Sequence, residues 1–112
     1  MNEIIELYSF MVDKMDIANK IVSMDEDDFV KDYDIVLVGF SIVESIKELL
    51  VKVNRDIFLI YDSLNEISKD FYHFSLMLVN EYGLINRYML YDYFKNGYKL
   101  IFDNISNILK GS

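Results

Sequence analysis

The fold of this chain depends on the stretch "IVLVGFSIV", residues 35–43, nine uncharged residues between Asp34 and Glu44. Such a stretch is compatible with three structures: a membrane-spanning helix, a buried β-strand, and the inside of a helix in a folded core. A spanning helix needs about 20 consecutive apolar residues, whereas Glu44, Lys47 and Glu48 follow this run at once. The choice therefore lies between a strand and a helix of a globular protein.

The spacing of apolar residues around this stretch favours the helix. Steps of three and four continue past residue 43, whereas a strand would need that pattern to stop there. The predicted buried stripe is Ile35, Val38, Ile42, Ile46, Leu49 and Val53. The β-branched residues favour a strand locally, and a buried strand is the alternative. Gly39 lowers helix stability, but it permits a close approach by a neighbouring helix.

Three further stretches repeat the helical period: residues 4–22, 57–82 and 84–108. Each carries apolar residues at steps of three and four, with charged residues largely off the stripe, which is typical of amphipathic helices. The first stripe includes Tyr8 and Val22.

Polar residues separate these stretches. Ser23 and Glu26 have the spacing of a capping box, which predicts that the second helix starts near residues 24–27. A second polar break occupies residues 54–56. Gly83 directly follows the third periodic run, and we expect it to be a helix C-cap.

Together these patterns predict an all-α fold over residues 1–112, in one domain. Short connections between long amphipathic helices indicate an antiparallel helical bundle with four main helices. The alternative is a globule of five or six helices, with breaks near residues 34, 63 or 96; the last is the pair Asn96–Gly97. A chain with no proline and four glycines is also poor material for the many tight turns of an all-β fold.

Residue types that carry most enzyme chemistry are scarce. The chain has no cysteine and one histidine, His73, so thiol nucleophiles are absent and a Ser-His-Asp triad is disfavoured. Asp70 and His73 have the spacing of di-iron helices, but that site needs a second such pair. The acidic residues 25–36 place Phe29 and Val30 where a calcium loop needs an oxygen ligand and a glycine. We therefore expect no enzyme activity, no cofactor and no metal site.

Negative charge is concentrated near the N-terminus. The net charge is −8; residues 1–34 carry ten acids and three bases, or −7, which leaves −1 for residues 35–112. Such a field attracts basic protein surfaces and repels nucleic acids and membranes. The predicted partner-binding acidic patch is Asp25, Glu26, Asp27, Asp28, Asp32 and Asp34. An export signal has positively charged residues near its N-terminus, whereas this chain has Glu3 and Glu6 there. We therefore expect a cytoplasmic protein.

Aromatic residues are concentrated in the second half of the chain. Twelve of the 17 follow residue 57, and five tyrosines lie between residues 82 and 98. One buried helix face does not hold so many rings, and tyrosine and methionine are common at interfaces. The predicted partner-binding or homodimer face is Tyr88, Met89, Tyr91 and Tyr93. The alternative is an unusually thick core.

These features favour a non-catalytic acidic protein-binding module that inhibits another protein, such as an immunity protein, an antitoxin or a phage anti-defence protein. Residues encoded by AT-rich codons abound, which suggests an AT-rich bacterium, its phage or a mobile element as the source. The alternatives are a structural or assembly subunit (a helical homo-oligomer or secretion partner), an acidic mimic of nucleic acid, and an enzyme or ligand carrier whose pocket lies inside the bundle. No direct binding to nucleic acid or membrane is expected.

Overall fold

The computed structural model describes residues 2–111, and within that range it is all-α and contains no β-strand, which confirms the predicted fold class. Residues 35–43 lie inside one long helix, so the helical reading of this stretch is confirmed and the strand is wrong. The helices are α1 (Asn2–Asp13), α2 (Met15–Ser23), α3 (Glu26–Lys31), α4 (Tyr33–Val51), α5 (Arg55–Ile60), α6 (Asp62–Met77), α7 (Arg87–Asn96) and α8 (Tyr98–Gly111).

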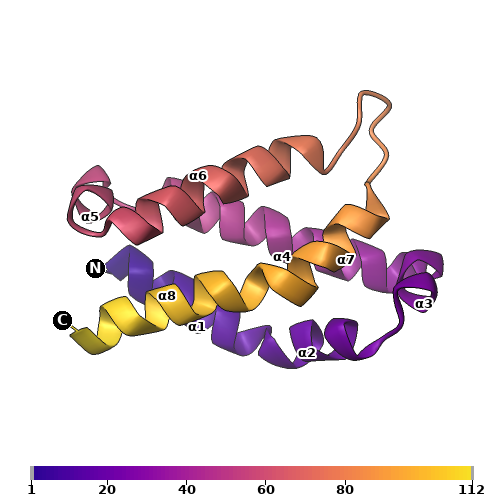
Figure 1. Ribbon diagram of the computed structural model, residues 1–112, viewed down its shortest axis with the longest axis horizontal. Helices are drawn as coiled ribbons and strands as arrows, with labels where there is room; N and C mark the ends of the chain where they lie inside the picture. Colours follow the sequence, from indigo (N-terminus) through magenta and orange to yellow (C-terminus); the bar gives the residue numbers. More distant parts are fainter. Residues whose placement is uncertain (1, 112) are drawn as a thin grey trace.

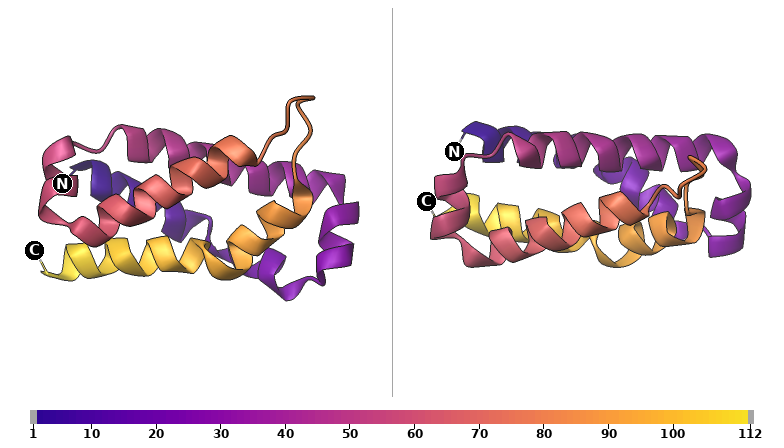
Figure 2. Two further views of the ribbon diagram at one scale, coloured as in Figure 1. Left: turned by 45° about the horizontal axis from the view of Figure 1, so that its top comes forward. Right: turned by 90° about the horizontal axis from the view of Figure 1, so that it is seen from above.

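The chain runs back and forth along the long axis of a flat molecule of 42 × 30 × 18 Å (Figure 1). Helices α1 and α2 lead away from the N-terminus to α3, and α4 returns. Helix α6 leads away again, and α7 and α8 bring the chain back. Helix α8 packs on α1 and α6, while α7 packs on α2, α3 and α4. Consequently α5 and both ends of the described chain lie at one end, and α3 lies at the other (Figure 2).

The buried stripe of α4 differs from the predicted one. The buried residues of α4 are Val36, Gly39, Ile42, Val43, Ile46 and Leu50. Val38 is 39% exposed, and Leu49 is only partly buried. Neighbouring residues point about 100° apart on a helix, and in α4 both candidate stripes are apolar, so the period alone did not choose between them. The same shift occurs in the first two helices, where Leu7 and Ile21 are buried instead of Tyr8 and Val22.

Breaks within the predicted segments lie at particular residues. Lys14 separates α1 from α2, Asp32 separates α3 from α4, Tyr61 separates α5 from α6, and Gly97 separates α7 from α8. At Gly97 a Cβ atom would lie 2.8 Å from Cδ1 of Tyr93 and 3.1 Å from its carbonyl oxygen. A residue with a Cβ atom would therefore clash with Tyr93, whose ring lies against the turn between α7 and α8.

The predicted capping box is wrong. Ser23 is the last residue of α2, and its hydroxyl donates a hydrogen bond to the carbonyl of Lys20 (2.7 Å). The residue that precedes α3 is Asp25. Residues 25–34, here called the acidic segment, do include a helix cap: the carboxylate of Asp32 accepts a hydrogen bond from the amide of Ile35 (3.2 Å) at the start of α4.

The predicted C-cap at Gly83 is also wrong. Helix α6 ends at Met77, six residues earlier, and Gly83 lies in the connection between α6 and α7. It adopts φ +76°, a conformation that favours glycine. The amide of Gly83 donates to the carbonyl of Asn80 (3.0 Å), so this glycine completes a tight turn.

A buried hydrogen bond joins the last helix to the first. The hydroxyl of Tyr98 in α8 donates to the carbonyl of Met11 in α1 (2.7 Å), and burial raises the pKa of Tyr98 above its ordinary value. We expect Tyr98→Phe to lower the free energy of unfolding by about 0.5–1.5 kcal/mol, the net value of such a bond. Urea denaturation measures the change. Tyr82→Phe is the control, because that side chain is 80% exposed; equal losses in the two variants would contradict the prediction.

Candidate functional site

The six predicted acidic residues lie in and around α3, at one end of the molecule, and all six are exposed. The short helix α3 has one buried residue, Phe29. Its ring packs at a tilt against Tyr91 of α7, with ring centres 5.5 Å apart. Phe29 therefore anchors α3 on the core, while the acidic side chains of the helix face outward.

Two residues of α7 make further contacts that position this segment. The guanidinium of Arg87 donates to the carbonyl of Val30 (2.6 Å) and lies 5.3 Å from the centre of the Tyr33 ring. The hydroxyl of Tyr91 donates to the carbonyl of Met24 (2.7 Å). These contacts join residues 57 and 67 positions apart. The acidic segment is therefore held in place by α7, and not by its own helix propensity.

The predicted aromatic face is not a single face, and two of its members are misplaced. Tyr91 and Tyr93 are 6% and 7% exposed and belong to the core, Met89 is partly buried, and Tyr88 is 56% exposed. Helix α7 has neighbours on several sides, so rings that point in different directions are all covered. The surplus of aromatic residues thus builds a thick core around Tyr93.

A loop that the sequence analysis did not single out carries prominent apolar side chains. Residues 78–86, here called the hairpin loop, connect α6 to α7 and project from the body of the molecule (Figure 1). Tyr82 is 80% exposed and Leu84 is 63% exposed. The signal in the sequence is Asn80 followed three residues later by Gly83, a pairing typical of turns.

Hydrogen bonds hold the hairpin loop in one shape. The Asn80 side-chain oxygen accepts from the amides of Tyr82 (2.9 Å) and Leu84 (3.1 Å). Its base is closed by a bridge between Val79 and Ile85 and by a 2.7 Å bond from the amide of Asn86 to the carbonyl of Leu78. The side chain of Asn86 then caps α7 by accepting from the amide of Met89 (3.1 Å). The exposed side chains are consequently presented by an ordered segment.

The structure brings the acidic segment and the hairpin loop to the same end of the molecule, which we call the binding end (Figures 1 and 2). Residues 25–34 carry six acids and one base, or −5, and the loop adds Glu81. The exposed apolar residues in the segments that meet at this end include Tyr33, Leu76, Met77, Tyr82, Leu84 and Tyr88. Exposed aromatic residues next to a charged rim are typical of protein-binding surfaces.

The described residues contain neither a metal-binding cluster nor a membrane-spanning helix. Within residues 2–111, no three histidine or acidic side chains are grouped so that they could hold a metal ion. His73 and Asp70 are both exposed on α6. None of the helices formed by this part of the chain combines the length and the apolar composition needed to cross a bilayer.

Comparison with protein-family models found no match, and comparisons with curated proteins and with solved structures found no similar protein.

Proposed function

We propose that this protein is a non-catalytic protein-binding module that inhibits a partner with a basic surface, as an immunity protein, an antitoxin or a phage anti-defence protein would. The observation that carries the proposal is the binding end, where an exposed acidic segment and an ordered apolar loop lie together. Its charge and its apolar groups suit different parts of one binding reaction.

The acidic segment acts on the rate of association. Exposed charges steer an oppositely charged partner over a distance set by the Debye length, about 8 Å at physiological salt. The hairpin loop acts on the lifetime of the complex, because buried aromatic and aliphatic anchors dominate binding energy. The hydrogen bonds of Asn80 already hold the backbone at Tyr82 and Leu84 in place, so little backbone conformational entropy is lost when their side chains are buried.

The helices serve as the scaffold of this surface. We infer that α1–α2, α3–α4, α5–α6 and α7–α8 act as the four antiparallel rods of one bundle, and that the protein works in the cytoplasm. In this scheme Arg87 and Tyr91 are positioning residues, since they connect the acidic segment to the rod that begins at the hairpin loop.

Charge reversal in the acidic segment is expected to slow partner binding. The variant replaces Asp27, Asp28 and Asp34 by lysine and leaves Asp32, because the carboxylate of Asp32 caps α4. The partner is first captured from the cells that encode this protein and identified by mass spectrometry, and association rates are then measured by surface plasmon resonance. We expect the association rate to fall by about tenfold or more at low salt, and most of that loss to disappear at high salt.

Two matched variants complete the experiment. Lysine at Glu48, Glu66 and Asp103, which are exposed on other helices, makes the same change in net charge away from the binding end and should cost far less. Tyr82→Ser with Leu84→Ser should raise the dissociation rate instead. If neither the acidic variant nor the loop variant changes the rates of partner binding, the proposal is refuted.

A second candidate function is self-assembly, and one observation favours it. Val51, Leu59 and Ile60 are 73%, 79% and 69% exposed around α5, at the end opposite to α3 (Figure 1). If they form a homodimer face, sedimentation equilibrium gives twice the monomer mass, and Leu59→Lys returns the protein to a monomer. A monomer at all concentrations leaves the binding end as the functional surface.

A further inference from the structure

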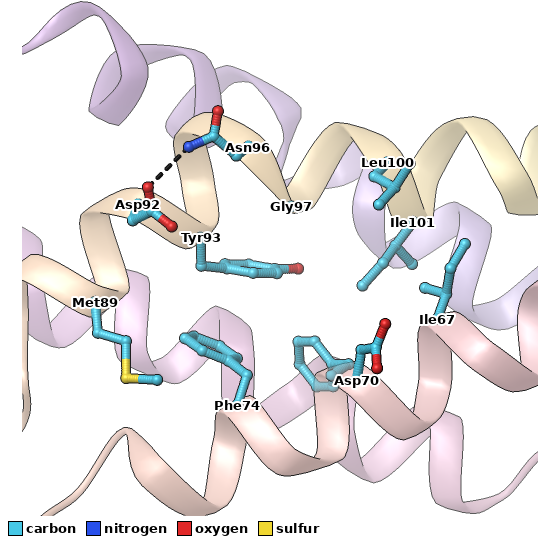
Figure 3. Close-up of a pocket in the computed structure, with 11 residues that line it drawn as sticks. Ile67, Asp70, Phe74, Met89, Asp92, Tyr93, Asn96, Gly97, Leu100 and Ile101 are labelled. Carbon is cyan, nitrogen blue, oxygen red and sulfur yellow. Dashed lines mark hydrogen bonds between the residues drawn. The ribbon is translucent and has the colours of Figure 1, made fainter.

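A groove of about 280 Å³ opens between α6 and the junction of α7 with α8 (Figure 3). Its apolar walls include Ile67 and Phe74 from α6, Met89 from α7, and Leu100 and Ile101 from α8. Small-molecule sites occupy about 300–1,000 Å³, so the groove is suited to a compact ligand. None of its lining residues belongs to the hairpin loop or to the acidic segment, and binding there goes beyond the function proposed above.

Tyr93 lies on the inner side of this groove, and its ring is closely packed. The ring is stacked on Phe74, with centres 5.0 Å apart and planes 18° apart, and meets the edge of Phe71 at 5.5 Å. Gly97 lies against it so closely that a Cβ atom would contact the ring at 2.8 Å. These neighbours hold the hydroxyl between α6 and α8 (Figure 3).

Tyr93 is only 7% exposed, and its buried hydroxyl has no hydrogen-bond partner among residues 2–111. The other two buried tyrosines, Tyr91 and Tyr98, each donate to a backbone carbonyl at 2.7 Å. An unpaired buried hydroxyl is unfavourable, and phenylalanine would form the same ring contacts without that cost. Burial raises the pKa of Tyr93 well above its ordinary value. The hydroxyl therefore keeps its proton and can donate it in a hydrogen bond.

Two carboxylates lie on the rim of the groove. Asp70 comes from α6 and Asp92 from α7, and Asp92 accepts a hydrogen bond from the side-chain amide of Asn96 (2.8 Å; Figure 3). The lining includes no lysine, arginine or histidine to neutralise them. A cationic group is therefore the favoured occupant of the rim, while the interior is apolar apart from one hydroxyl.

We propose that this groove binds a small amphipathic amine: an apolar body against Leu100 and Ile101, a hydrogen-bonding oxygen at the Tyr93 hydroxyl, and an ammonium group at the rim, attracted by the negative charges of Asp70 and Asp92. Tyramine is the probe, because it has a phenol oxygen at one end and an ammonium at the other. Two of its analogues each lack one feature: phenethylamine lacks the oxygen, and 4-ethylphenol lacks the amine.

Isothermal titration calorimetry with the full chain tests the assignment of each ligand group. Tyr93→Phe should weaken tyramine binding by about tenfold, the value of one hydrogen bond, and leave phenethylamine binding unchanged. Asp70→Asn with Asp92→Asn should weaken both amines by about threefold to tenfold and spare 4-ethylphenol. The lysine variant of Asp27, Asp28 and Asp34 is the control, because none of these residues lines the groove, and it should leave all three ligands unaffected.

Melting temperatures without ligand give an independent measurement. Tyr93→Phe should be at least as stable as the natural protein, because it removes an unpaired hydroxyl and retains the ring. The proposal is overturned by any of three results: no binding of tyramine at millimolar concentration, equal binding of tyramine by Tyr93→Phe, or a clear loss of stability in that variant. Partner capture by the Asp70 and Asp92 variant separates this proposal from the proposed function, since capture should be unchanged whichever result is obtained.

Discussion

Replacing Ile46 by aspartate is expected to unfold the protein. Ile46 lies in the middle of α4 and is 0% exposed, in the apolar core between α4 and its neighbours. The substitution removes a buried side chain, worth about 2–5 kcal/mol, and leaves an unpaired carboxylate in its place. The total stability of a domain of this size is about 5–15 kcal/mol. We therefore expect loss of most helical circular dichroism at 25 °C.

Two other aspartate substitutions in α4 serve as controls for this result. Val51→Asp should cost less than about 1 kcal/mol, because Val51 is 73% exposed. Leu49→Asp should fall between the two, since Leu49 is only partly buried. If Ile46→Asp melts at the temperature of Val51→Asp, then α4 does not bury the face described above.

Replacing Phe29 by alanine is expected to release the acidic segment from the body of the protein. Phe29 is the one buried residue of the six-residue helix α3 and packs on Tyr91. A buried Phe→Ala substitution costs about 3–5 kcal/mol. A helix of six residues is not stable alone. We therefore expect much of the lost stability to appear as local unfolding of α3.

Hydrogen exchange measures this local effect. Amides of residues 26–31 should lose protection in Phe29→Ala, while those of α8 retain theirs. Glu26→Ala is the matched control, because Glu26 is exposed on the same helix. Association with the partner should slow in Phe29→Ala even though its net charge is unchanged. Retained protection at residues 26–31 would show that other contacts hold α3.

The fold class could be predicted from the sequence because it depends on local periodicity. Apolar steps of three and four persist through residues 35–53 and have only one regular structure as their source. The break at Gly97 was also foreseen, since a glycine within a helical pattern is a local signal. By contrast, the capping box at Ser23 was wrong, because several acidic residues nearby offer competing helix starts.

The candidate site could be predicted only in part. The acidic residues are charged and polar, so their exposure follows from their chemistry, and the structure leaves all six exposed. Tyr91 and Tyr93 are amphipathic, and their chemistry permits either a core or a surface position. Their burial depends on helices α2, α3 and α6, which are distant in sequence, and no local pattern reports those contacts.

By itself the sequence determined that the chain is helical, that its acidic charge lies in the first 34 residues, and that its aromatic residues lie mainly in the second half. Only the tertiary structure decided that α7 meets α3, so that the hairpin loop and the acidic segment share one end, and that Tyr93 is enclosed with its hydroxyl unpaired. The physical reason is that helix propensity and charge act over a few residues. Packing between segments tens of residues apart determines which of two apolar stripes is buried. It also determines which tyrosine hydroxyl donates a hydrogen bond to a backbone carbonyl.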